Sequence, residues 1–246
     1  MDRMIFLAMS AARQMLNGQA AAAHNLANAN TTGFKADFEA YRAMPMFGDG
    51  FPSRVFSMAE RPGIDLAPGA IESTSNDLDI AVAGEGMIAV QAPDGSEAYT
   101  RAGDLKLDNV GLLTTGAGAP VLGNGGPISL PPSEKIAIGV DGTISIRPVG
   151  QAENTLAQVD RIRLVKPDPK NLVKGDDGLF RTRDKSAAPP DASITVTSGA
   201  LESSNVNPLS EMIQMIETSR RYELAVKAMH TAEQMDADSA RVLRLN

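Results

Sequence analysis

The chain has 246 residues, of which 43% are hydrophobic and 22% charged, a balance typical of a globular protein. Only 4% of the residues are aromatic and none is Trp, so any core must be built from Ala, Val, Ile, Leu and Met. The formal net charge of −7 argues against a nucleic-acid-binding protein, because phosphates require a basic surface. Cysteine is absent, which excludes disulfides and thiol chemistry.

The N-terminal segment is where a targeting sequence would be expected. Its apolar run, residues 5–9, is shorter than a signal peptide requires. Residues 14–34 carry no formal charge, but their Gln and Asn side chains make them too polar for a membrane span. We therefore predict neither a cleaved signal peptide nor insertion into a membrane.

The first predicted element is a helix over about residues 2–34. Alanine is frequent there, and apolar residues recur at steps of three, four and seven, which keeps one helix face apolar. Gly33 is the predicted stop, because glycine readily takes the left-handed conformation that ends helices. The apolar positions are Ile5, Met9, Ala12, Leu16, Ala23 and Leu26.

The middle of the chain is predicted to be all-β. Residues 36–76 resemble an extended connector, with Pro62-Gly63 and Pro68-Gly69 as turns. Residues 77–204 hold short alternating runs that Asp-Gly pairs separate, which is typical of strands joined by tight turns. The runs are 78–82, 135–138, 143–146 and 161–164, and the Asp-Gly turns end at Gly95, Gly142 and Gly178.

A second long helix is predicted over about 208–245. Asn207 can cap it, Pro208 suits the first helical position, and Glu211 favours the N-terminal end of the helix dipole. Its apolar stripe contains Met212, Met215, Tyr222, Val226 and Met229.

These elements predict the α+β class: an all-β central domain with long N- and C-terminal helices that pair antiparallel as a coiled-coil-like stem. The helices of residues 1–35 and 205–246 then form one assembly domain beside the connector and the β domain. Two helices alone leave apolar surface exposed, and further copies of the same pair would cover it. Periodicity alone leaves the alternative open that both stripes belong to an ordinary core.

Candidate chemistry is sparse. His24 and His230 both fall in the helical termini, so neither a Ser-His-Asp triad nor a histidine metal site is predicted in the β domain. Gly84-x-Gly86 imitates a dinucleotide fingerprint, but the residues after it continue as a strand instead of a helix. We predict no catalytic residue, no metal and no cofactor. A β-rich enzyme or carbohydrate-binding module with helical oligomerisation arms, or a membrane-surface protein, remains the alternative.

Three ordered motifs resemble those of one protein family. Residues 25–35 read N-L-A-N-A-N-T-T-G-F-K and resemble the N-terminal signature of flagellar rod and hook proteins. Residues 77–86 with 99–105 and 111–114 resemble the start of the family's β domain, and residues 199–208 resemble the lead-in to its C-terminal helix. The signature positions are Asn25, Leu26, Ala27, Asn28, Thr31, Gly33, Phe34 and Lys35.

The resemblance implies a structural subunit, not an enzyme, that polymerises through its terminal helices around the export channel of the flagellar basal body. It further implies a periplasmic location, export through the flagellar apparatus without signal-peptide cleavage, and other rod subunits and copies of itself as partners. Residues 1–6 and 176–181 are most similar to the proximal-rod members, with distal-rod proteins as the near alternative. The apolar helix positions are the expected assembly interface.

Overall fold

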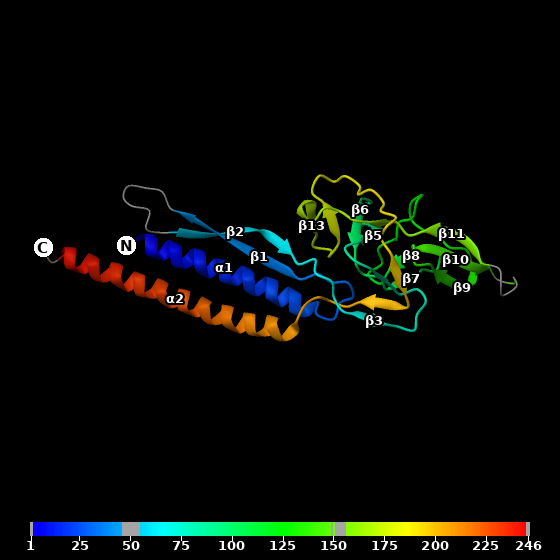
Figure 1. Ribbon diagram of the computed structural model, residues 1–246. Coiled ribbons are helices and arrows are strands. Elements are labelled where there is room, and N and C mark those ends of the chain that lie inside the picture. The colour runs from blue at the N-terminus through cyan, green and yellow to red at the C-terminus, as the bar shows by residue number, and fades with distance from the viewer. Residues whose placement is uncertain (1, 46–54, 149, 151–155, 245–246) are drawn as a thin grey trace. The chain divides into compact units, whose positions relative to one another are not determined.

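The computed structural model describes residues 2–45, 55–148, 150 and 156–244, and it has the predicted α+β composition of two long helices and many short strands (Figure 1). The chain divides into two compact units. We call Met1–Ala29, Ala36–Asp65 and Val206–Asn246 the helical unit, and Asn30–Lys35 with Leu66–Asn205 the β unit.

The helical unit contains α1 (Asp2–Ala27), β1 (Asp37–Pro45), β2 (Val55–Ile64) and α2 (Pro208–Arg244). The two helices contact each other and run in opposite directions (Figure 1). Small side chains from both helices are buried in this unit. These are Ala12 and Ala22 of α1 and Ala225 and Ala232 of α2.

The first helix is shorter than the sequence predicts. It ends at Ala27, and the following turn is closed by Asn28, whose backbone and side-chain nitrogens both donate to the carbonyl of His24. The Asn-rich segment after Ala27 has side chains that compete for backbone groups, which favours a turn over a helix. Gly33 does have a positive φ of 66°, but it lies in the β unit instead of ending α1.

Residues 37–64 also differ from the predicted connector. β1 and β2 pair antiparallel from Asp37 opposite Ile64 to Pro45 opposite Val55. Pro62-Gly63 lies within β2 and not in a turn, with Gly63 opposite Phe38. The ring of Phe38 lies against Gly63, so a Cβ at that position would come within 2.3 Å of the ring. Glycine is therefore used here for close packing of a side chain, a role that composition does not distinguish from a turn.

The start of α2 matches the prediction. The side chain of Asn207 accepts hydrogen bonds from the backbone nitrogens of Leu209, at 3.1 Å, and Ser210, at 3.2 Å. Its carbonyl accepts the first helical bond, from the nitrogen of Glu211. Asn207 is therefore the N-cap, and Pro208 occupies the first helical position, where its missing N–H costs nothing.

The β unit is built from short antiparallel strands in several small sheets. One sheet has the order β12-β5-β6-β14-β13 and another the order β11-β10-β9, while β15 pairs with β4, β16 with β3 and β7 with β8. The strands are β3 (Ile71–Ser73), β4 (Ile80–Val82), β5 (Met87–Gln91), β6 (Glu97–Thr100), β7 (Leu105–Leu107), β8 (Leu113–Thr115), β9 (Ser133–Ile138), β10 (Thr143–Pro148), β11 (Ala157–Arg161), β12 (Leu164–Val165), β13 (Leu172–Lys174), β14 (Phe180–Thr182), β15 (Val196–Ser198) and β16 (Ala200–Glu202), with the short helix η1 (Pro169–Asn171) before β13.

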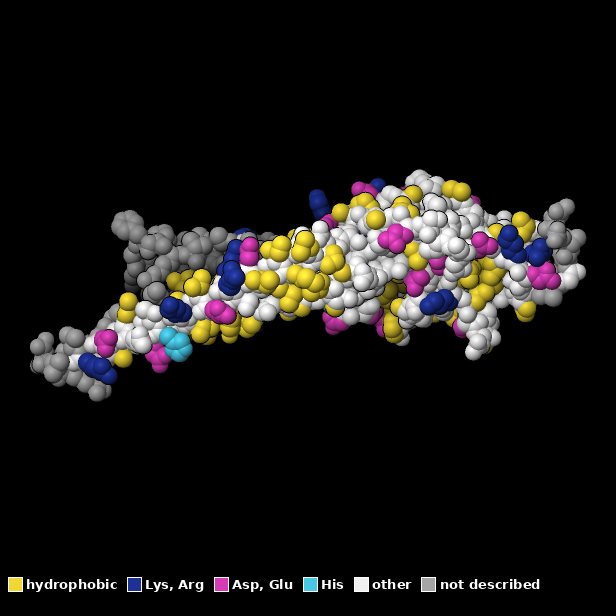
Figure 2. Space-filling view, turned by 90° about the horizontal axis from the view of Figure 1, so that it is seen from below, with side chains coloured by type: hydrophobic (Ala, Val, Ile, Leu, Met, Phe, Trp, Pro, Cys, Tyr) yellow, Lys and Arg dark blue, Asp and Glu magenta, His cyan; other side chains and the backbone are white. Residues whose placement is uncertain are grey.

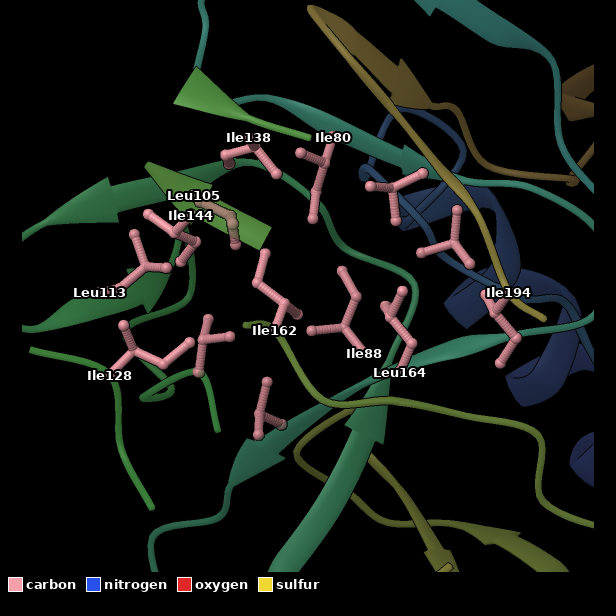
Figure 3. Packing of buried hydrophobic residues seen from close by; sticks show 14 of the residues in the cluster. Ile80, Ile88, Leu105, Leu113, Ile128, Ile138, Ile144, Ile162, Leu164 and Ile194 are labelled. Carbon is pink, nitrogen blue, oxygen red and sulfur yellow. The ribbon is translucent and has the colours of Figure 1, made fainter. Parts of the chain in front are cut away.

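The core of this unit is aliphatic, as the composition requires. Ile80, Ile88 and Ile144 are fully buried in one cluster with Leu113 and Ile162, and they converge from strands and loops far apart in the chain (Figure 3). The Asp-Gly turns are confirmed, with positive φ at Gly95, Gly142 and Gly178.

Two other predictions in the β unit concern residues 161–164 and the segment after Gly84 and Gly86. The run 161–164 does not form one strand, because β11 ends at Arg161 and β12 begins at Leu164. After Gly84 and Gly86 the chain continues as β5, so the glycines do not precede a helix, as the sequence indicated.

Candidate assembly site and motif cluster

The predicted assembly positions differ in their exposure to solvent. Ala12 is buried, Ile5 and Leu26 are half-buried, and Met9 and Leu16 are exposed on α1. On α2, Met215, Tyr222, Val226 and Met229 are half-buried, whereas Met212 is exposed. Within the single chain, part of each stripe is thus covered and the remainder is exposed.

Asn25, the first residue of the family motif, connects three elements of the helical unit. Its side chain is buried with 3% exposure; the amide nitrogen donates to the Asp37 carbonyl at 2.8 Å and to Glu211 Oε1 at 3.3 Å. Its amide oxygen accepts from the Asp37 nitrogen at 2.8 Å. One asparagine therefore joins the end of α1 to the start of β1 and to the first turn of α2, which explains an amide at this position.

The neighbouring charged groups extend this connection. His24 Nδ1 lies 2.8 Å from a carboxylate oxygen of Asp37, with about half of the imidazole exposed. His230 instead lies near Glu233 on its own helix, so each histidine has a different acidic neighbour. Within the part of the chain that the structure describes, Glu211 Oε2 is buried without a hydrogen-bond partner.

We expect Asn25→Ala to destabilise the helical unit by about 1–3 kcal/mol, because the backbone groups of Asp37 and the carboxylate of Glu211 lose their partner. Thermal unfolding followed by helical circular dichroism measures the effect. Asn17→Ala, at an exposed position of α1, is the matched control and should be neutral or slightly stabilising. Equal melting temperatures for the two variants would contradict the role given to Asn25.

The end of the motif lies in the β unit and forms a buried ion cluster. Lys35 Nζ donates to Glu202 Oε1 at 2.5 Å and Arg101 Nη1 donates to Glu202 Oε2 at 3.0 Å. The three side chains are 0 to 3% exposed. Lys35 also donates to the carbonyl oxygen of Ala67, and Arg101 also donates to the carbonyl oxygens of Val82 and Gly84.

Glu202 is the centre of this cluster. The same Oε1 accepts from the Gly69 nitrogen at 2.9 Å, and the backbone carbonyl of Glu202 accepts from the Gly33 nitrogen at 2.7 Å. Burial lowers the pKa of Arg101, whereas the negative charges of Glu202 and Glu85 act in the opposite direction. We call Lys35, Arg101 and Glu202 the ion cluster. It links the first segment of the β unit, residues 30–35, to the last residues of the unit, near Asn205.

Gly33 and Phe34 also pack closely beside the ion cluster, in the first segment of the β unit. A Cβ on Gly33 would lie 2.3 Å from the backbone carbon of Arg101, so only glycine permits this approach. The Lys174 ammonium lies 3.8 Å from the centre of the Phe34 ring, a cation–π contact. The remaining motif residues are less enclosed: Asn28 is half-buried, and Ala27 and Thr31 are exposed.

Arg101 and Glu202 were part of the quoted family segments but were not predicted as site residues. Each is a single charged residue in a short strand or loop, where sequence alone suggests a solvated side chain. Only the pairing of β16 with β3 and the course of the chain after β6 bring both to Lys35.

The described helices and acidic side chains were compared with what a membrane span and a metal site require. None of the helices of the described residues is long and apolar enough to cross a bilayer. Over the same residues, no group of three or more His, Cys, Asp or Glu side chains is placed to hold a metal ion.

Family models match three parts of the chain. The model "Flagella basal body rod protein" matches residues 6–35, "Flagellar hook protein FlgE/F/G D1 domain" matches 81–146, and "Flagellar basal body rod FlgEFG protein C-terminal" matches 197–242. These matches contain most of α1 with the motif, several strands of the β unit from β5 to β9, and most of α2.

Curated relatives extend the likeness over the whole chain. The flagellar basal-body rod protein FlgF of Escherichia coli is 44% identical over 239 residues, 95% of each chain. FlgF of Salmonella typhimurium is 41% identical over 252 residues, covering all of both chains, and FlgG of Buchnera aphidicola (Schizaphis graminum) is 31% identical over 236 residues, with 86% of this chain and 88% of the relative covered. The chain belongs to the flagellar basal-body rod protein family and is a FlgF-like structural rod protein of the basal body.

Proposed function

We propose that this chain is a proximal-rod subunit that polymerises through its terminal helices around the export channel, with α1 and α2 forming a coiled-coil-like stem. It reaches the periplasmic rod through the flagellar export apparatus without signal-peptide cleavage and contacts copies of itself and other rod proteins, FlgG-like subunits included. Similarity of 41–44% to two FlgF proteins, against 31% to a FlgG, supports the proximal over the distal rod. The family is structural, so no catalytic role is proposed.

The observation that carries the proposal is a large exposed apolar surface on α2. Hydrophobic side chains gather over the first turns of this helix (Figure 2). The residues are Leu209, Met212, Ile213 and Ile216, each about half exposed or more. Their spacing of three and four places them side by side on the helix surface. Such a patch on a soluble chain is typical of a protein interface.

α1 has a second apolar surface of its own. Phe6, Met9 and Leu16 are each close to half exposed, although Ala12 and Ala22 of the same helix are buried. The two surfaces are made by different helices and different residues, so contact between the α1 surface of one copy and the α2 surface of the next is heterologous. A heterologous contact repeats without limit unless its rotation closes a ring. Such open-ended repetition is what a rod requires.

Basal bodies from cells that lack the gene, with and without the gene restored, test the proposed place in the rod. We expect electron microscopy to show loss of the rod beyond its base, rescue by the intact gene, and no rescue by a gene lacking residues 5–26. Normal basal bodies and normal motility in the deletion strain would refute the assignment.

A point variant tests the helix surface. Ile216→Glu places a carboxylate in the exposed apolar surface of α2, and we expect it to abolish incorporation into the rod while leaving the circular dichroism of the isolated chain unchanged. Val110→Glu, at an exposed apolar position of the β unit, is the control and should still be incorporated. Normal incorporation of Ile216→Glu would show that another surface mediates assembly.

A further inference from the structure

A cavity of about 400 Å³ lies within the β unit, beside the ion cluster. Much of its lining is apolar, with Leu66, Met87 and Leu172 among the residues. Ile71 also lines the cavity and is 59% exposed, so it lies on the solvent-facing side of the lining. An apolar concave site that contains a few polar groups is the usual construction of a small-ligand site.

The polar group that distinguishes this cavity is the guanidinium of Arg101. The residue lines the cavity, and its side chain is only 3% exposed. Nη1 donates to the Val82 carbonyl at 2.8 Å and to Glu202 Oε2 at 3.0 Å, while Nη2 donates to the Gly84 carbonyl. These hydrogen bonds occupy both N–H groups of Nη1 and one N–H group of Nη2.

Two N–H groups of Arg101 are therefore unused. They are the N–H of Nε and the second N–H of Nη2, and neither has an acceptor among the residues that the structure describes. A buried N–H group without an acceptor is unfavourable, and in native proteins such groups are normally satisfied by protein, water or ligand atoms. The number of unused donors does not depend on the charges of the surrounding side chains.

We propose that this cavity is a binding site for a small carbonyl compound with a short apolar chain. The carbonyl oxygen has two lone pairs, so it accepts from both unused N–H groups of Arg101. The apolar chain lies against Leu66, Met87 and Leu172, where it is removed from water. All lining residues belong to the β unit of one chain, so binding does not depend on polymerisation.

Titration of the full chain with butyl methyl ketone, followed by NMR, tests the donor. We expect saturable shifts of the methyl signals of Met87 and Leu172, together with a downfield shift of the Nε proton of Arg101, because a hydrogen bond deshields that proton. The Nε signal is assigned by its loss in Arg101→Lys. Ketone that causes no saturable shift, or that moves the methyl signals without the Nε proton, would overturn the proposal.

The matched control ligand is the hydrocarbon in which a CH₂ group replaces the carbonyl oxygen of the ketone. It has the same shape and the same apolar chain but cannot accept a hydrogen bond. We expect it to move the methyl signals of Met87 and Leu172 and to leave the Nε proton of Arg101 unchanged. An equal shift of the Nε proton with both ligands would show that the carbonyl oxygen is not recognised.

Two tryptophan variants locate the bound ketone. Ile71→Trp enlarges an exposed side chain of the lining, and we expect it to weaken ketone binding about tenfold by filling part of the cavity. Val173→Trp is the control, because Val173 of β13 is also apolar, is 43% exposed and lies outside the lining. This control should bind the ketone as the unchanged chain does. Equal affinities of the two variants would place the ketone elsewhere and contradict the assignment.

Discussion

Glu202→Gln is expected to lower the free energy of unfolding of the β unit by about 3–5 kcal/mol, the usual cost of removing one partner from a buried ion pair. The glutamine retains the shape and an acceptor oxygen, but it removes the negative charge with which both buried cations, Lys35 and Arg101, are paired. Urea unfolding, combined with hydrogen exchange of β5 and β6, measures the loss in the unit itself.

Glu85→Gln is the matched control for this change. It also removes a carboxylate paired with a lysine, but Glu85 and Lys166 are exposed to solvent, so the loss should be small. The double variant Lys35→Met with Glu202→Gln should lower the free energy of unfolding by less than the sum of the single effects. The reason is that Lys35→Met also removes one of the two cations that Glu202 pairs with. If Glu202→Gln and Glu85→Gln unfold at the same urea concentration, the ion cluster does not have the role assigned to it.

Gly33→Ala is the second change expected to have a large effect, about 3 kcal/mol in the β unit. Two penalties combine: the φ of 66° is unfavourable for a side chain, and the new Cβ would approach the Arg101 backbone to 2.3 Å. The backbone of Arg101 cannot move without disturbing the hydrogen bonds of the ion cluster. Differential scanning calorimetry of the full chain measures the shift.

Gly95→Ala separates the two penalties. Gly95 has a similar φ of 81°, but a Cβ there would meet no atom within 4 Å. We expect this variant to lose only about 1 kcal/mol, from the backbone alone. A Gly33→Ala variant as stable as Gly95→Ala would show that the junction tolerates a methyl group, and the motif glycine would then need another explanation.

The parts of the fold that sequence predicted are those that local chemistry determines. The cap at Asn207 and the positive φ of Gly95 depend on residues within a few positions of each other. The end of α1 was placed too late because Asn and Gly both end helices, and the first Asn after Ala27 took that role. The β1–β2 pair was missed because the contact of Phe38 with Gly63 joins residues that only a hairpin brings together.

The same limit applies to the site. Motif resemblance found Asn25 and Lys35, but it could not supply their partners. Asn25 bonds to Glu211 at a separation of 186 residues, and Lys35 bonds to Glu202 at a separation of 167. Hydrophobic periodicity likewise located the helix stripes, but it did not separate their half-buried positions, such as Met215, from their exposed positions, such as Met212.

The 167 residues between Lys35 and Glu202 also determine the order in which the β unit can be completed. A chain released N-terminus first delivers both cations of the cluster well before the carboxylate that neutralises them. Until β15 and β16 emerge, β4 and β3 lack the strands that pair with them. Because these closing contacts are long-range, the unit cannot complete its fold before its last strand is present. The ion cluster and the two strand pairs at this edge of the unit are thus completed only when residues 196–202 are present.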